Sequence, residues 1–145
     1  MNFDNKTNNQ LQNYLIKQGV ISNQTLWHIQ TGGRTNKVWR LAGEEDYTCK
    51  LYLDTGNNPL FNNTPDEEYK CLLWLEGSDI APKPYKFLKT PFGDVLLYNF
   101  IKGEIWSNNV ETVSELLTRI RKHNTLAGCE FFLIYQQTSK KLGLK

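Results

Sequence analysis

Hydrophobic residues in this chain are spaced first as in a helix and then as in strands, a pattern that predicts a mixed α and β fold. Leu11, Tyr14 and Leu15 recur at i, i+3 and i+4 in a polar background, so we expect a helix over about residues 8–18 that ends at Gly19. Segments suited to strands follow, at residues 26–31, 36–41, 47–53, 85–89 and 95–100.

Two further helices are predicted downstream of the first strands. One begins at Thr64-Pro65-Asp66-Glu67, a capping box in which Glu67 reaches back to the N–H of Thr64, and it runs to about Glu76. The other ends near His123, and its apolar face consists of Val110, Val113, Leu116, Leu117 and Ile120. Because the first of these helices falls between the third and fourth strands, we predict an α+β fold, with a five-stranded antiparallel sheet and that helix packed on one face.

A glycine pair and a lysine suggest chemistry on this sheet. Gly32 and Gly33 stand between the first two strands, and Lys50 lies in the third. Glycine lets bare backbone approach a ligand, and backbone N–H donors beside a lysine suit the oxygens of a polyphosphate. Since these glycines open a strand rather than a helix, the P-loop and the dinucleotide fingerprint are excluded, and a kinase-type loop is left. Taken singly, a glycine pair is also the ordinary mark of a turn, and a strand lysine commonly faces solvent.

Glu68 shares a helix face with the apolar residues Cys71, Leu72 and Leu75. A carboxylate buried on such a face needs a cation, because an unpaired buried charge is strongly unfavourable. Lys50 is the partner that we predict. The alternative is a solvated Glu68 at the border of the apolar face.

Composition limits the classes of function. A chain of 145 residues fits one domain, and a net charge of +2 with both signs interspersed gives no reason to expect nucleic acid or a membrane surface as a partner. Cys49, Cys71 and Cys129 are odd in number and lack C-x-x-C spacing, which argues against a zinc site or disulfide framework and favours a reducing cytoplasm. We interpret His28 as a neutral strand histidine, because no carboxylate or cysteine neighbours it, and His123 as a surface residue that complements the dipole at its helix C-terminus.

The order of these features resembles the N-terminal part of the aminoglycoside phosphotransferase and choline kinase family, which includes thiamine kinases and shares the protein-kinase fold. The resemblance spans roughly residues 25–125 and rests on segments 32–36, 47–50, 68–75, 80–84 and 96–103. It implies a kinase-like N-lobe at 25–103, which follows the N-terminal helical segment at 1–24. Residues 104–145 would hold the hinge exit, the first helix of the C-lobe and a tail.

The resemblance also implies a nucleotide site, with ATP and Mg²⁺ as the cofactors of the complete family enzyme. Lys50 would contact the α- and β-phosphates, and Glu68 would orient Lys50. The glycine loop would cover the phosphates, and the hinge would present backbone C=O and N–H groups to the adenine edge. These contacts would come from Gly32, Gly33 and Thr35 in the loop and from Asn99 and Ile101 in the hinge.

The family's catalytic motif, H-G-D-x-x-x-x-N, and its further metal-binding aspartate have no match in this sequence, where His28 precedes Ile29 and His123 precedes Asn124. We therefore expect the nucleotide-binding lobe of an ATP-dependent phosphotransferase for small alcohols, truncated before its catalytic loop, without metal ligands and inactive alone. The alternative is a non-catalytic binding or interaction module that reuses the lobe. An unrelated α+β domain with a chance glycine turn fits the order of features less well.

Two expectations concern what the lobe would bind. The family's acceptor-binding residues belong to the C-lobe, so aminoglycoside, choline, thiamine and other alcohols stay open as acceptors. The apolar face of the helix at 110–120 would lack a C-lobe to cover it, which predicts self-association or a partner chain at that face.

Overall fold

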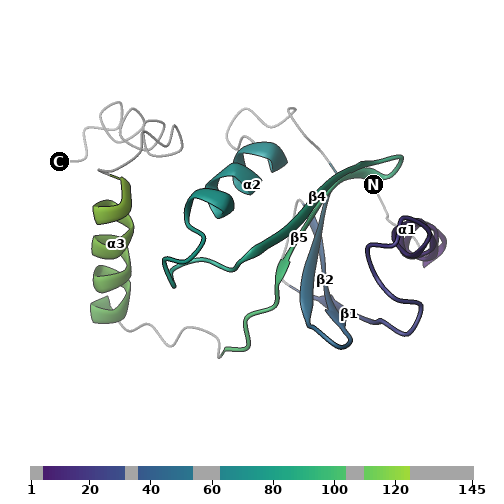
Figure 1. The fold of residues 1–145 in the computed structure, drawn as a ribbon, viewed down its shortest axis with the longest axis horizontal. Helices are drawn as coiled ribbons and strands as arrows, with labels where there is room; N and C mark the ends of the chain where they lie inside the picture. The colour runs from purple at the N-terminus through teal and green to yellow at the C-terminus, as the bar shows by residue number, and fades with distance from the viewer. Residues whose placement is uncertain (1–4, 32–35, 54–62, 104–109, 125–145) are drawn as a thin grey trace. The chain divides into compact units, whose positions relative to one another are not determined.

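The computed structural model describes residues 5–31, 36–53, 63–103 and 110–124, and it has the predicted α+β fold (Figure 1). The helices and strands begin and end within three residues of their predicted bounds. The helices are α1 (Asn5–Lys17), α2 (Pro65–Trp74) and α3 (Val110–Asn124). The strands are β1 (Leu26–Gln30), β2 (Asn36–Ala42), β3 (Tyr47–Tyr52), β4 (Pro84–Thr90) and β5 (Gly93–Asn99).

The five strands form one antiparallel sheet in the order β1-β2-β3-β5-β4, as predicted in number and direction. β5 is therefore an inner strand, hydrogen-bonded to β3 on one side and to β4 on the other. In sequence, α2 falls between β3 and β4. Within the part of the chain that the structure describes, no helix combines the length and hydrophobicity needed to cross a lipid bilayer.

The chain divides into two compact units. The first consists of Met1–Asp66 with Pro84–Phe100, and the second of Glu67–Lys83 with Ile101–Lys145. The whole sheet and α1 belong to the first unit, whereas α3 and most of α2 belong to the second.

The hydrophobic core of the first unit lies between α1 and one face of the sheet. Leu11 and Leu15 of α1 are fully buried, because their face of the helix packs on alternate residues of the inner strands. The sheet residues of this core are Trp39, Leu41, Cys49, Leu51, Val95 and Leu97. We refer to this side of the sheet as the α1 face.

The end of α1 is set by Gly19, as the sequence predicted. Gly19 has a φ of 64°, its N–H donates to the carbonyl of Ile16 at 2.9 Å, and the N–H of Val20 donates to the carbonyl of Leu15 at 3.0 Å. These two bonds form a Schellman motif, in which a residue with positive φ ends the helix. The motif directs Val20 back into the core beside Leu15.

The turn between β4 and β5 depends on a second glycine. Gly93 has a φ of 127°, and a Cβ atom at this position would lie 2.4 Å from the carbonyl oxygen of Tyr52. Thr90 fastens the turn, since its Oγ1 donates to the carbonyl of Gly93 at 2.7 Å and accepts from the N–H of Phe92 at 3.1 Å. Only glycine therefore lets β5 start this close to β3.

In the second unit, α3 is linked to the segment after α2. Nη2 of Arg119, in α3, donates to the carbonyl oxygen of Ser78 at 3.1 Å. Within the segment after α2, Nζ of Lys83 lies 3.7 Å from a carboxylate oxygen of Glu76. The predicted apolar face of α3 is largely open among the described residues: Val110, Leu116 and Leu117 are exposed, and Val113 and Ile120 are half-buried.

Candidate functional site

Lys50 lies on the side of the sheet opposite the α1 face. Its neighbours in β3, Cys49 and Leu51, both point into the α1 core, and successive side chains of a strand alternate between faces. Lys50 is half-buried, and its Nζ lies 4.7 Å from the ring centroid of Tyr52, two residues further along the same face. The predicted phosphate-binding lysine is thus held over an aromatic ring in a cation–π contact.

The face around Lys50 is mainly apolar. Its register partners are Val38 on β2 and Leu96 on β5, and Leu96 has no exposed surface. Thr48 and Tyr52 precede and follow Lys50 on this face, and both are buried. We call this side the lysine face; its residues near the centre of the sheet are Val38, Arg40, Thr48, Lys50, Tyr52, Leu96 and Tyr98.

Glu68 is the fourth residue of α2 and is half-buried. Leu72, one turn further along the same helix face, is buried, in agreement with the predicted apolar stripe. The preceding glutamate, Glu67, accepts a hydrogen bond from Nζ of Lys70 at 2.9 Å. Lys50 belongs to the first unit and Glu68 to the second, and an ion pair between them stays a prediction.

The predicted hinge follows β5. The N–H of Phe100 donates to the carbonyl oxygen of Asp46 at 2.9 Å, which extends the β3–β5 ladder by one hydrogen-bonded pair. Because backbone groups alternate in direction along a strand, those of Asn99 point away from β3, toward the side of β4. There β4 starts at Pro84, opposite Tyr98, so the backbone of Asn99 lies just past the start of β4. Asn99 and Ile101 are both exposed.

A charged cluster that the sequence analysis did not predict holds this end of β5. Arg40 donates from Nε and Nη2 to Oδ2 of Asp46, at 3.0 and 2.5 Å, and its guanidinium lies 4.8 Å from the ring centroid of Phe100. Opposite charges on either side of the turn after β2 were a signal in the sequence for the Arg40–Asp46 pair. The contact with Phe100 had no such signal, because it depends on β5 lying beside β3.

The predicted loop residues Gly32, Gly33 and Thr35 lie outside the described residues. The structure resumes at Asn36, whose side-chain amide forms two reciprocal hydrogen bonds with that of Asn63, at 3.0 and 2.8 Å. Both residues are buried, so this pair ties the first residue of β2 to the segment that precedes α2. The sequence analysis missed it, since asparagine is common throughout this chain and 27 residues separate the two.

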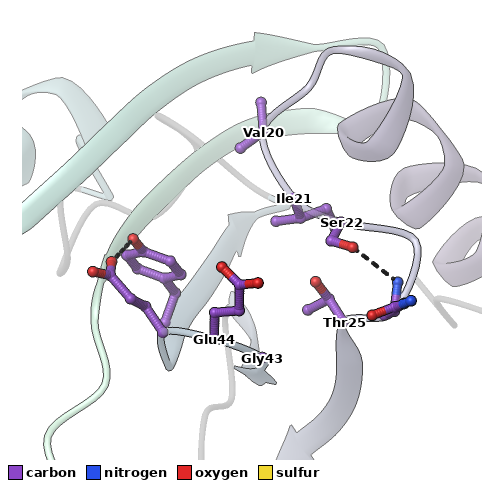
Figure 2. Close-up of a pocket in the computed structure, with 9 residues that line it drawn as sticks. Val20, Ile21, Ser22, Thr25, Gly43 and Glu44 are labelled. Carbon is purple, nitrogen blue, oxygen red and sulfur yellow. Dashed lines mark hydrogen bonds between the residues drawn. The ribbon is translucent and has the colours of Figure 1, made fainter.

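A cavity of about 420 Å³ lies elsewhere on the first unit (Figure 2). The cavity is beside Tyr47. The side chain of Tyr47 lies on the side of the sheet opposite Lys50, because it is two residues from Cys49 along β3. Figure 2 shows the carboxylate of Glu44 pointing into the cavity. The hydroxyl of Tyr47 donates to the carboxylate of Glu45, and this bond, together with burial, raises the pKa of Tyr47 to about 12. With two carboxylates and no lysine or arginine in its lining, this cavity does not suit a polyphosphate.

Within the described ranges, no three or more His, Cys, Asp or Glu side chains are grouped closely enough to hold a metal ion.

Comparison with known proteins does not assign the chain to a family: no protein-family model and no curated protein matches it.

Proposed function

We propose that this chain is the nucleotide-binding lobe of an ATP-dependent phosphotransferase that acts on small alcohols. The observation that carries the proposal is the position of Lys50, on the third strand of a five-stranded antiparallel sheet and on the face that α1 leaves uncovered. Protein kinases place their phosphate-binding lysine on the third strand and pair it with a glutamate of the next helix. Lys50 and Glu68 occupy these two places in the order of elements.

The spacing along β5 supports a single ligand that reaches both Lys50, the predicted phosphate contact, and Asn99, the predicted base contact. Leu96 is the register partner of Lys50, and Asn99 follows it by three residues. At about 3.3 Å per residue, Asn99 is roughly 10 Å from Leu96 along the strand. That distance suits a nucleotide with its base at Asn99 and its phosphates at Lys50.

In this proposal the chain binds and positions the nucleotide. Lys50 supplies a positive charge for the α- and β-phosphates, and the backbone of Asn99 receives the base. No H-G-D motif occurs in the 145 residues, so we expect binding without transfer by this chain alone. The odd number of cysteines and the lack of C-x-x-C spacing support our proposal of a reducing cytoplasm.

The test is a comparison of ATP and adenosine binding by isothermal titration calorimetry. Lys50→Ala should weaken ATP binding by about 10- to 100-fold, the effect of losing a hydrogen bond between charged groups, and should leave adenosine binding unchanged. Lys86→Ala is the matched control, because Lys86 is exposed, lies on the same sheet and faces the opposite side. Wild-type protein that binds no ATP, or equal losses in the two variants, would contradict the proposal.

A further inference from the structure

The charged cluster at the end of β5 joins three residues from three different segments. Arg40 comes from β2, Asp46 from the turn before β3, and Phe100 from the residue just after β5. Arg40 is the register partner of Thr48, which in turn is the partner of Tyr98. Asp46 and Phe100 lie two residues from Thr48 and Tyr98 respectively, so all three cluster residues lie on the lysine face.

Asp46 holds Phe100 through two separate routes. Its backbone carbonyl accepts the N–H of Phe100 at 2.9 Å, and its side chain fixes the guanidinium of Arg40 through two N–H groups. The guanidinium in turn lies 4.8 Å from the Phe100 ring centroid. The side chains of Arg40 and Asp46 are only 33% and 22% exposed, so water screens this pair less than a surface ion pair.

The consequence for the site is that Phe100 is fixed by both its backbone and its ring. Asn99 directly precedes Phe100, so a fixed Phe100 also sets the direction of the Asn99 carbonyl. Holding a hydrogen-bonding group in its binding orientation before the ligand arrives lowers the entropy cost of binding.

We propose that Arg40 and Asp46 are positioning residues that orient the hinge backbone toward the base of the nucleotide. This inference rests on the proposed function, because it needs a nucleotide bound along β5. It assigns Arg40 to the base end of the ligand, although Arg40 carries a positive charge and shares a face with Lys50. Two of its N–H groups bind Asp46 and its guanidinium lies against the Phe100 ring, so in this proposal Arg40 acts through Phe100.

The test uses three variants and two ligands, with affinities measured by calorimetry. Arg40→Met keeps the length of the side chain but removes the hydrogen bonds and the planar cation, and Asp46→Asn keeps the backbone carbonyl but removes the charge. Each should weaken adenosine and ATP by the same factor, about five- to tenfold, the effect of losing one ordinary hydrogen bond between the hinge backbone and the base. Arg40→Lys keeps the charge and should recover part of the loss. The ratio of the two affinities should stay at its wild-type value, whereas Lys50→Ala should change it.

A control separates positioning from general loss of stability. Leu88→Ala removes a half-buried side chain that packs against the α1 core from β4, and it should leave both affinities unchanged at a temperature where all variants are folded. Folding is verified for each variant by circular dichroism.

The outcomes separate this inference from the proposed function. If wild-type protein binds neither ligand, the proposed function fails, and the inference fails with it. If wild-type protein binds both ligands and Arg40→Met binds them equally well, the inference alone is wrong. A loss for ATP but not adenosine would mean that Arg40 contacts phosphate directly, and an equal loss in Leu88→Ala would mean a general effect of stability; either result overturns the inference.

Discussion

Replacement of Gly93 by alanine gives a sharp test of the sheet geometry. The backbone at Gly93 has a φ of 127°, and residues other than glycine held in such sparsely populated regions lose roughly 1–3 kcal/mol. The new Cβ atom would also lie 2.4 Å from the carbonyl oxygen of Tyr52 and 3.3 Å from Cδ1 of Leu51. Because the nearer atom belongs to the backbone of β3, the overlap can be relieved only by moving the two strands apart.

Two other glycines serve as matched controls. Gly19 has a φ of 64° but open space around its missing Cβ, so Gly19→Ala should cost only the backbone term, about 1–2 kcal/mol. At Gly43 the φ is not positive and the nearest atoms are at 3.7 and 3.8 Å, so Gly43→Ala should change stability by less than about 1 kcal/mol. Gly93→Ala carries both the backbone term and the overlap, and we expect a loss of at least about 3 kcal/mol.

Urea denaturation followed by circular dichroism measures these differences. With a slope of about 1–3 kcal/mol per molar urea, a loss of this size lowers the midpoint by roughly 1–3 M. The slope itself should stay constant across the series, which would show that stability and not compactness has changed. If Gly93→Ala loses no more than Gly19→Ala, the close approach of β5 to Tyr52 is wrong.

Four further predictions concern single features of the chain. Cys49 is fully buried and burial raises the pKa of its thiol, so iodoacetamide should label it only after unfolding, as peptide mass spectrometry would show; labelling in native protein contradicts its place in the core. Tyr47 has a folded-state pKa raised from 10.0 to about 12, chiefly by its bond to Glu45, so its contribution to stability is complete below pH 10 and is lost as the pH rises toward 12. Urea midpoints measured across this range should show the loss, and Glu45→Gln should reduce it. The purified chain should transfer no phosphate from ATP to an alcohol; turnover that Lys50→Ala abolishes would refute this. Leu117 of α3 is 57% exposed, so light scattering should show association that grows with protein concentration and that weakens in Leu117→Glu. A protein that stays monomeric at all concentrations would contradict an interface on α3.

The elements that the sequence predicted well carry strong local signals. α1 ends at Gly19 because only a residue that tolerates positive φ can close a Schellman motif, and α2 begins at Pro65 because proline suits the first helical position. The direction of Lys50 follows equally from local pattern, since apolar Cys49 and Leu51 on either side point to the core.

The arrangement of those elements in space was less predictable. The consecutive apolar residues Val95, Leu96 and Leu97 indicate that β5 is buried on both faces, but they do not show that β5 pairs with β3 as well as with β4. The cluster of Arg40, Asp46 and Phe100 depends on that pairing, and so it could not be found from the sequence. The same is true of the Asn36–Asn63 pair, because an amide gives no sign of which distant amide it will meet.

The position of β5 between β3 and β4 also implies an order of folding. β2–β3 and β4–β5 are hairpins that can form within microseconds, whereas β3 meets β5 only when Tyr52 and Asp94, 42 residues apart, come together. Closing so long a loop costs entropy before the paired strands stabilise it, so we expect the two halves of the sheet to form first and to dock last along this seam. If docking is the rate-limiting step, the folding rate depends on side chains that already meet in its transition state, such as Val95 and Leu51. Residues of the outer strands then mainly affect the unfolding rate.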